Sequence, residues 1–328
     1  ADRLLFMPDL FAHALCGSAV CERTIASTSQ MLDPATGDWA FDVLKTYNIP
    51  DRLFAPPTAT GSIIGQYKDA KVVAVAGHDT QCAVAALPTN ADNIAFLSCG
   101  TWSLLGCELD APLTVDTTLS NEIGANGKIN YLKNIIGLWL IQESRREWKR
   151  QGKDYSYADL EKLALAAKPF YCFIDPDDAE FTPPGNLPER VQIYCRKSAQ
   201  PVPDSVGAIM RCIYESLALK YRYALEQLQT NTGKRFTALH ILGGGTKDGL
   251  LCQMTANACG IPVVAGPVEA TALGNILIQL KALGAIPSLA AGRDLIAKTE
   301  PLKRYESSEM GVWNDDAYIK YKKILERK

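Results

Sequence analysis

Hydrophobic and polar residues follow two rhythms along this chain, and the changes between them predict its elements. Short apolar runs rich in branched side chains predict strands, and longer stretches with apolar residues three or four positions apart predict amphipathic helices. Strands are predicted at residues 71–77, 93–99, 102–109, 238–242 and 261–265. Helices are predicted at 135–150, 156–168, 205–230, 247–259, 269–283, 288–298 and 315–327. Strands that alternate with helices indicate parallel pairing through crossovers, and therefore an α/β fold.

Cap and turn residues bound several of these elements. Glycines that suit left-handed C-caps follow three of the predicted helices: Gly233, Gly260 and Gly284. Ser156 and Asp159 have the spacing of a capping box at the start of a helix. Six prolines between residues 172 and 203 predict a loop-rich region there.

The first 70 residues follow the pattern less clearly. An apolar stretch at residues 4–11 is interrupted by Pro8 and Asp9, which favours a buried helix over a signal peptide. A second helix is predicted near Trp39–Tyr47, followed by a proline-rich loop. Because this region shows few strands of its own, we interpret it as the end of a larger domain.

Composition places the chain among ordinary globular proteins. Of its 328 residues, 47% are hydrophobic and 21% are charged, and its formal net charge at pH 7 is -2. We see no run of basic residues that would mark a nucleic-acid surface and no apolar run long enough to span a membrane. A small-molecule partner is therefore the better expectation, and the pattern indicates no oligomeric state.

Cysteines bear on metal binding and on the cell compartment. The chain has ten cysteines and three histidines, but no C-x-x-C pair, so a structural zinc site is not expected. Most of the thiols lie in apolar segments, where they behave as small hydrophobic groups, and this predicts a reducing cytoplasm. Cys195 and Cys212 flank a proline-rich turn and could come close, although a disulfide between them is not favoured.

An apolar strand that ends in an acid is the first candidate for chemistry. The predicted strand at 71–77 leads directly into His78, Asp79 and Thr80. A carboxylate held at a strand end can accept the proton of an alcohol during phosphoryl transfer. On residue type alone, however, a cap for the following helix is the favoured role of Asp79. His78 and Thr80 would contact a hydroxylated ligand or make structural hydrogen bonds.

Two glycine-rich turns are candidates for nucleotide contacts. Gly100 and Thr101 lie between two predicted strands, where they would cradle a phosphate or simply form a hairpin turn. Gly243, Gly244 and Gly245 follow a strand and open a helix, a position that suits close approach of an anion. These glycines match neither the Walker nor the Rossmann pattern, so a tight strand–helix turn is an equal alternative.

Two amides lie around the predicted helix at 135–150. Asn134 and Gln142 are separated by about two helical turns, so they can share one face. Either could reach a ligand, although without other information a surface role is favoured.

Taken in order, these motifs resemble the FGGY family of carbohydrate kinases. The resemblance runs through nearly the whole chain, and each segment is weak alone while the ordered set is specific. The segments are Met7–Phe11, Leu15–Gly17, Thr24–Leu32 with Trp39, Gly77–Thr80, Leu97–Leu104, Leu132–Leu140, Leu239–Gly245 and Cys259–Asn275. The sequences at 78–80 and 133–139 favour the branch of the family that acts on L-rhamnulose.

The resemblance implies an actin-like (ribonuclease H-like) fold of two α/β domains with a catalytic cleft between them. Residues 1–76 would be the end of the sugar-binding domain, and residues 77–328 would be the nucleotide-binding domain. The family also uses an N-terminal Asp-x-Gly-x-Ser/Thr phosphate-binding hairpin, which this sequence does not contain. The first domain is therefore expected to be incomplete, and the chain alone to have weak or no kinase activity.

The implied activity is transfer of the γ-phosphoryl group of ATP, as its Mg²⁺ complex, to the 1-hydroxyl of L-rhamnulose. Asp79 would be the base, and His78, Thr80 and Asn134 would contact the sugar. ATP would be bound by Gly100, Thr101, Gln142, Gly243, Gly244 and Gly245. No side chain is assigned to a metal, and Glu269–Gly274 would be a hinge connector.

Three alternatives stay open beside this activity. The first is another FGGY ketose kinase that acts on fuculose or xylulose. The second is an ATP-binding module without transfer activity. The third is a non-catalytic actin-like partner protein, against which the acid at the predicted strand end argues.

Overall fold

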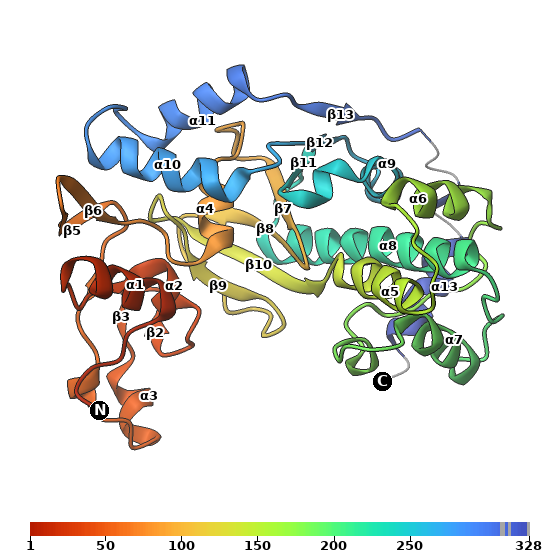
Figure 1. The fold of residues 1–328 in the computed structure, drawn as a ribbon, viewed down its shortest axis with the longest axis horizontal. Coiled ribbons are helices and arrows are strands. Elements are labelled where there is room, and N and C mark those ends of the chain that lie inside the picture. Colours follow the sequence, from red (N-terminus) through yellow and green to blue (C-terminus); the bar gives the residue numbers. More distant parts are fainter. Residues whose placement is uncertain (309–311, 314–315, 327–328) are drawn as a thin grey trace. The chain divides into compact units, whose positions relative to one another are not determined.

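The largest sheet has seven strands in the order β13-β12-β11-β7-β8-β10-β9 (Figure 1). These strands are β7 (Ile94–Cys99), β8 (Trp102–Leu109), β9 (Ser120–Ile123), β10 (Ile129–Ile136), β11 (Ala238–Leu242), β12 (Val263–Ala265) and β13 (Lys303–Tyr305). β11 is parallel to β7 and to β12, whereas β13 and β9 run antiparallel to their neighbours. The parallel strands are almost completely buried, which explains why they read as continuous apolar runs.

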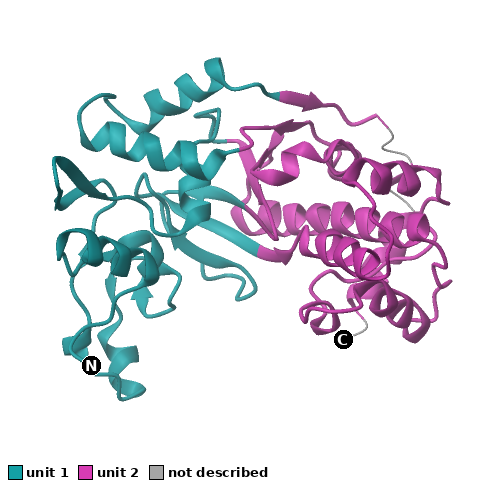
Figure 2. Cartoon of the chain, in the orientation of Figure 1, with its two compact units in different colours: residues 1–92, 106–133, 269–302 teal, residues 93–105, 134–268, 303–328 magenta. Residues whose placement is uncertain are grey.

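The computed structural model describes residues 1–308, 312–313 and 316–326. The chain folds into two compact units, shown in teal and magenta in Figure 2. Unit 1 consists of residues 1–92, 106–133 and 269–302, and unit 2 consists of residues 93–105, 134–268 and 303–328. Each unit is therefore assembled from separate stretches of the sequence.

Unit 1 contains the short elements of the N-terminal region and two longer helices. They are α1 (Met7–Cys16), β1 (Cys21–Glu22), α2 (Arg23–Ser27), β2 (Leu32–Asp33), β3 (Asp38–Trp39), α3 (Phe41–Thr46), η1 (Asp51–Leu53), β4 (Pro57–Thr58), β5 (Ser62–Tyr67), β6 (Ala70–Ala74), α4 (Asp79–Ala85), α10 (Ala270–Ala282) and α11 (Leu289–Thr299). Trp39 centres a small core, where its ring lies 4.7 Å from that of Phe54 and its indole N–H donates to Ala55 O at 2.7 Å. α10 packs against α4 and α11.

Unit 2 is built around one long buried helix, α8 (Val206–Thr232), which contacts α6 and α9 most extensively. Its other helices are α5 (Trp139–Arg150), α6 (Tyr157–Ala166), η2 (Ala179–Phe181), α7 (Leu187–Lys197), η3 (Gly244–Lys247), α9 (Gly249–Cys259) and α13 (Asp316–Leu325). Lys220 of α8 is buried and pairs with Asp175 at 2.7 Å and Asp177 at 2.9 Å. This triad ties the long helix to the loop before η2, because a buried ammonium group needs counter-charges.

Several predictions from the pattern are confirmed. β8 and β11 have the predicted bounds, and α8 begins and ends within two residues of the predicted helix. Gly233 and Gly260 take the left-handed conformation at helix C-caps, with φ of 69° and 68°. Ser156 and Asp159 make both hydrogen bonds of the capping box. Local capping chemistry therefore set these helix ends.

Two predictions for unit 2 differ from the structure at secondary-structure level. The helix expected at 135–150 begins only at Trp139, because the apolar Ile135 and Ile136 complete strand β10. The region expected to be loop-rich at 172–203 also contains an eleven-residue helix, α7. Its Pro188 sits in the first turn, where the missing N–H has no helical partner, and the Asn186 side chain caps the helix by accepting from Glu189 N–H.

The helix expected at the start of the chain exists, but it is not buried. α1 spans Met7–Cys16, and the exposed fractions of Met7 and Phe11 are 64% and 67%. Asp9 is its buried residue, and its Oδ1 accepts from Glu22 N–H at 3.1 Å. α1 therefore buries the carboxylate of Asp9 and exposes the apolar side chains of Met7 and Phe11.

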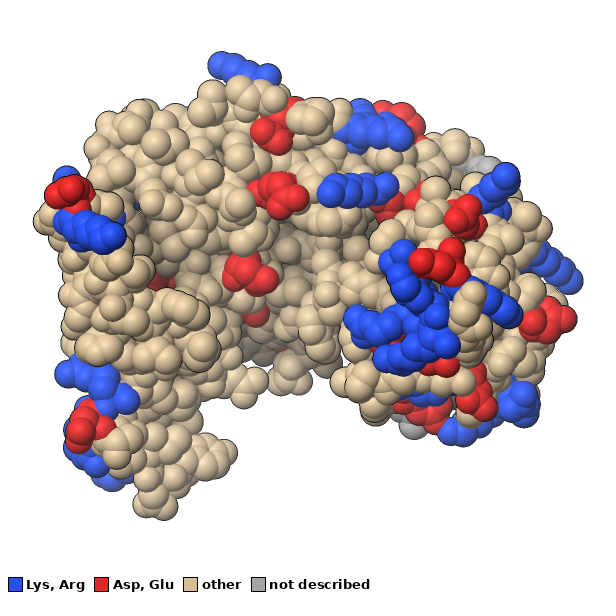
Figure 3. Space-filling model, in the orientation of Figure 1, with Lys and Arg blue, Asp and Glu red and all other residues tan. Residues whose placement is uncertain are grey.

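The charged surface agrees with the balanced composition. Basic side chains gather over α5 in Figure 3, and they belong to a helix that also carries acids. Within this group Arg146 and Arg150 pair with Glu143, and Lys149 pairs with Asp154 at 3.2 Å. The patch is basic at the surface because Glu143 itself is buried, but its charge is partly neutralised by these ion pairs. Among the described helices, none combines the length and apolar character that a membrane span requires.

Candidate active site

Asp79 opens helix α4 and is not carried by a strand end. Strand β6 stops at Ala74, because its partner in the two-stranded sheet, β5, begins opposite that residue at Ser62. The position that caps α4 is occupied by His78, so the capping role considered for Asp79 is also wrong. The Asp79 side chain is 80% exposed, and its Oδ1 accepts from Thr80 N–H at 2.7 Å. The carboxylate is therefore held at one oxygen and accessible to solvent.

A buried glutamate fixes the approach to Asp79. Glu22 is 1% exposed, and its Oε2 accepts from Gly77 N–H at 2.9 Å and from Thr24 N–H at 3.0 Å. A Cβ on Gly77 would come within 2.9 Å of Ile25, so only glycine allows the loop to pass this close to α2. The segment before Asp79 is thus anchored to α2 rather than extended as a strand.

His78 lies between two carboxylates. Its Nδ1 is 3.1 Å from Glu122 Oε2 in β9, and its Nε2 is 3.5 Å from Asp79 Oδ1. Burial disfavours the charged imidazole, but the hydrogen bond and charge of Glu122, together with the charges of Asp79 and Glu22, outweigh it and raise the pKa of His78. Sequence reasoning missed Glu122, because nothing local connects it to a residue far earlier in the chain.

Thr80 and the rest of α4 face inward. The exposed fraction of Thr80 is 3%, and every residue from Thr80 to Ala85 is buried. α10 packs directly on this helix, and Thr271 Oγ1 donates to Asp79 O at 3.4 Å. A Cβ added at Gly274 would lie 1.8 Å from Cys82 O. This close contact with α10 fixes the position of α4, which begins at Asp79.

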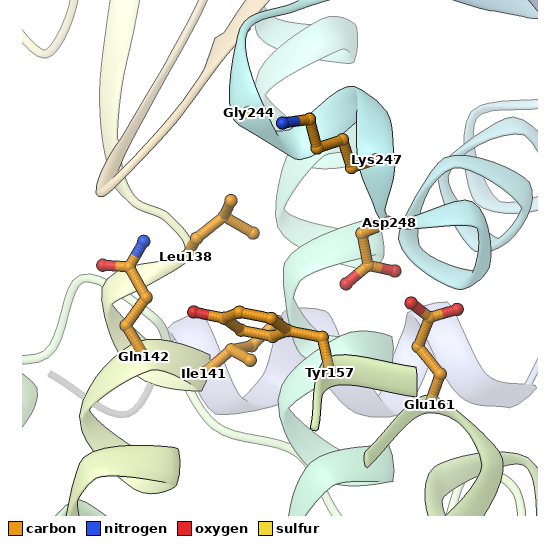
Figure 4. A pocket seen from close by; sticks show the side chains of 8 residues that line it. All are labelled: Leu138, Ile141, Gln142, Tyr157, Glu161, Gly244, Lys247 and Asp248. Carbon is orange, nitrogen blue, oxygen red and sulfur yellow. The ribbon is translucent and has the colours of Figure 1, made fainter. Parts of the chain in front are cut away.

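Unit 2 contains a pocket of about 260 Å³ that is lined by two of the predicted nucleotide residues, Gln142 and Gly244 (Figure 4). It is lined by Leu138, Ile141 and Gln142 near or on α5, Tyr157 and Glu161 on α6, and Gly244, Lys247 and Asp248 between β11 and α9. In Figure 4 the Tyr157 ring extends between Gln142 and the two carboxylates. Sequence reasoning missed Tyr157, Glu161 and Asp248, although the N-cap position of Asp248 was a usable local signal.

The three glycines after β11 are required for different structural reasons, and only Gly244 lines the pocket. Gly243 has a φ of 85°, which other residues rarely adopt. A Cβ on Gly245 would lie 2.2 Å from Cys99 Sγ, so this glycine lets the turn pack on β7. A Cβ on Gly244 would meet nothing within 4 Å, so Gly244 offers open backbone at the pocket wall. The strand–turn arrangement predicted for these three residues is confirmed, although a 3₁₀ turn precedes the α-helix.

Two carboxylates give the pocket its polar character. Asp248 caps α9 by accepting from Leu251 N–H at 2.9 Å and also accepts from the Tyr214 hydroxyl at 2.7 Å. Burial raises the pKa of Asp248, and these hydrogen bonds partly oppose it. Burial also raises the pKa of Glu161, with the negative charge of Asp248 as the next cause. Such groups can accept hydrogen bonds from hydroxyl or amino groups beside the aromatic face of Tyr157.

The Gly100–Thr101 turn joins β7 and β8 and also holds the start of α5. Gly100 N–H donates to Trp102 O at 2.8 Å, as expected for a hairpin turn. The carbonyl of Gly100 accepts from Leu138 N–H at 2.9 Å, and that of Thr101 accepts from Trp139 N–H at 3.2 Å. Thr101 Oγ1 donates to Gln142 Oε1 at 3.3 Å, so these two predicted ATP residues lie together.

Asn134 is placed differently from its prediction. It is an exposed residue of strand β10, whereas Gln142 lies on helix α5. The two amides therefore do not share a helix face. The cause is the same extension of β10 through Ile136 that shortened the predicted helix.

Three buried cysteines meet in unit 2. The sulfur atoms of Cys172, Cys195 and Cys212 all lie within 4.8 Å of one another, and all three thiols are free. The predicted approach of Cys195 to Cys212 is confirmed. Hydrogen bonds from Cys172 and then Cys212 lower the pKa of Cys195. Spacing did not predict a three-cysteine group, because its members come from a loop, α7 and α8.

Comparisons with known proteins agree with this architecture. The chain is 44% identical to a rhamnulokinase from Bacteroides thetaiotaomicron, across 99% of this chain and 69% of that protein. It is 40% identical to a rhamnulokinase from Enterococcus faecalis, across 94% of this chain and 65% of that protein. The chain thus spans about two thirds of the length of these curated relatives.

Solved structures share the fold at low sequence identity. A ligand-bound xylulose kinase from Lactobacillus acidophilus superposes with a TM-score of 0.75 at 17% identity, across 99% of this chain and 68% of that one. Glycerol kinase from Plasmodium falciparum with ADP gives a TM-score of 0.71 at 17% identity, across 97% of this chain and 64% of that one. The model of the FGGY family of carbohydrate kinases, C-terminal domain, matches residues 95–283. The chain therefore belongs to the FGGY family of carbohydrate kinases.

Proposed function

We propose that the protein transfers the γ-phosphoryl group of Mg-ATP to the 1-hydroxyl of L-rhamnulose. The observation that carries this proposal is Asp79, an exposed carboxylate whose Oδ1 accepts from Thr80 N–H and lies 3.5 Å from His78 Nε2. Phosphoryl transfer to an alcohol needs such a group to accept the hydroxyl proton as the new O–P bond forms and ADP leaves. The relatives at 44% and 40% identity are rhamnulokinases, which supports rhamnulose as the acceptor.

The remaining residues are assigned to two groups in this proposal. His78 and Asn134 would contact the sugar, with residues 1–76 as the end of a sugar-binding domain. Thr80, predicted to join them, is buried and would act through its N–H, which donates to Asp79. The nucleotide would use the unit 2 pocket, with its apolar floor, the Tyr157 ring and the open backbone of Gly244. The other ATP residues would be Gly100, Thr101, Gln142, Gly243 and Gly245. Mg²⁺ would arrive with the ATP phosphates, and the free thiols support a cytoplasmic location.

A panel of ketoses tests the acceptor. L-Rhamnulose, L-fuculose and D-xylulose would be compared by ATP-dependent ADP release from the intact gene product that contains this chain. We expect the highest kcat/KM with rhamnulose. A higher kcat/KM with xylulose would favour the alternative suggested by the xylulose kinase fold neighbour. Nucleotide binding without turnover on any sugar would favour an ATP-binding module.

The nucleotide pocket makes a separate prediction. Tyr157→Ala removes the aromatic face of the pocket, and base stacking on such a ring contributes roughly 1–3 kcal/mol, so the Kd for ATP is expected to rise about tenfold. Calorimetric titration with ATP measures this without sugar. Tyr171→Ala is the matched control, because Tyr171 is also a partly exposed tyrosine of unit 2 but does not line the pocket. Equal ATP affinity in the wild type and Tyr157→Ala would mean that the adenine ring of ATP does not stack on Tyr157.

A further inference from the structure

Glu122 is a buried carboxylate whose counter-ion is a histidine. The residue is 5% exposed, and its Oε2 accepts from the Gln81 amide at 2.8 Å while its Oε1 accepts from the Ser120 hydroxyl at 3.2 Å. In the part of the chain that the structure describes, no lysine or arginine forms an ion pair with it. A buried charge requires a partner of opposite sign, so His78, at 3.1 Å, is the group that can neutralise Glu122.

The two ring nitrogens of His78 both face carboxylate oxygens. A neutral imidazole donates from only one nitrogen, whereas the imidazolium donates from both. Gln81 Nε2 also lies 3.4 Å from Nδ1, but it donates to Glu122 Oε2. The contacts of 3.1 Å from Nδ1 to Glu122 and 3.5 Å from Nε2 to Asp79 therefore match the protonated ring. Gln81 buttresses this arrangement from α4, because Asn130 of β10 donates to its side-chain oxygen.

The orientation of His78 has a consequence for Asp79. An exposed carboxylate at the start of a helix is free to rotate unless something holds it. Thr80 N–H and the His78 ring both contact Oδ1, which leaves Oδ2 available to an incoming hydroxyl group. A ring held by Glu122 thus sets which oxygen of Asp79 is presented.

We propose that Glu122 is a positioning residue that acts through His78 to hold Asp79 ready to accept the sugar proton. This inference rests on the proposed function, because it assigns Asp79 the role of base. Glu122 touches neither substrate in this scheme. It keeps the imidazole protonated and oriented, and the imidazolium in turn holds Asp79 Oδ1.

The proposal makes the arrangement sensitive to pH. The charged groups that face His78 are Glu122 on β9, Asp79 on α4 and Glu22 beside the preceding loop, and all are acidic. The positioned state is complete while His78 is protonated and is lost as the pH rises through the pKa of His78. Turnover should therefore fall on the alkaline side, and removing the charge of Glu122 should move that fall to lower pH.

The first part of the proposal is that Glu122 keeps His78 protonated. Titration of the histidines, followed by NMR, tests this without any sugar or nucleotide. The chain has three histidines, and burial lowers the pKa of His240 to about 4, so few signals compete with that of His78. In the wild type we expect the His78 midpoint above that of an ordinary histidine, and in Glu122→Gln we expect it at lower pH. A wild-type midpoint at or below the ordinary value would overturn the proposal, and this measurement needs no variant to fold.

The second part of the proposal is that the protonated His78 positions Asp79 for turnover. Kinetics of the intact gene product test this part. Glu122→Gln is expected to lower kcat about tenfold with a smaller change in the KM for ATP, and to shift the alkaline limb to lower pH. In a His78→Gln background the same substitution should have no further effect, because Glu122 acts only through that ring. Equal losses from Glu122→Gln in both backgrounds would overturn the proposal.

Glu108→Gln is the matched control. Glu108 is also an enclosed carboxylate of unit 1, paired with Arg293 at 2.8 Å, so its loss reports general destabilisation. It should leave the His78 midpoint and the pH profile unchanged. A wild type with no turnover on any sugar but the expected titration would contradict the proposed function. A fully active wild type whose kinetics are indifferent to Glu122→Gln would contradict the positioning role alone.

Discussion

Replacing Asp79 with asparagine is expected to lower sugar-dependent turnover about 1000-fold while ATP binding survives. A general base contributes roughly 10²–10⁴-fold to such reactions, and an amide cannot accept the hydroxyl proton. The fold should tolerate the change, because the side chain is 80% exposed and an asparagine oxygen can still accept from Thr80 N–H. The measurements are kcat by ADP release and the Kd for ATP by calorimetry, both on the intact gene product.

Asp92→Asn provides the control for Asp79→Asn. Asp92 is another acid of unit 1 with an 84% exposed side chain, and it pairs with Lys128 rather than with His78. Its substitution should leave turnover within about twofold of the wild type. If Asp79→Asn kept turnover within a few-fold, Asp79 would not be the base.

Gly274→Ala is expected to lower the free energy of unfolding by about 3 kcal/mol, the upper end of the usual cost of overpacking a core. The added Cβ would lie 1.8 Å from Cys82 O and 2.6 Å from its carbonyl carbon, so backbone must move. α10 would be pushed from α4, the helix that begins at Asp79, and the hydrogen bond from Thr271 to Asp79 O would be strained. Turnover should therefore fall along with stability. Thermal or denaturant unfolding measures the first effect, and ADP release measures the second.

Gly292→Ala separates a backbone clash from simple crowding. Its Cβ would come 2.9 Å from a terminal methyl of Leu277, and such a side chain can change its rotamer. Alanine also has the better helix propensity by about 1 kcal/mol, so the net change in stability should be small. Equal destabilisation by both substitutions would mean that the contact with Cys82 is not the cause.

Local signals predicted those parts of the fold that depend on neighbouring residues. The strand at 238–242 is apolar except for His240 and is followed directly by Gly243, so its end was readable. Ser156 and Asp159 are three residues apart and satisfy each other directly. Gly233 ends α8 because its own backbone supplies the left-handed cap. None of these features needs information from a distant segment.

Errors arose where a distant partner decided the outcome. The apolar run through Ile135 and Ile136 suits a helix or a strand, and its place in the seven-stranded sheet selected the strand. β6 ended at Ala74 because β5 offered no further partner. Pro188 reads as a loop residue in isolation, yet the first turn of α7 accommodates it.

The sequence by itself determined the family, the order of the motifs and the identity of the candidate base, because these reside in residue type and spacing. The tertiary structure alone decided what surrounds that base. Glu122 reaches His78 from β9, and Tyr157 joins Gly244 in one pocket, only after the chain has folded. Asp79 became a residue at a helix start rather than a strand end for the same reason. Contacts between distant segments depend on which strands and helices pack together, and the local pattern of residues does not specify that packing.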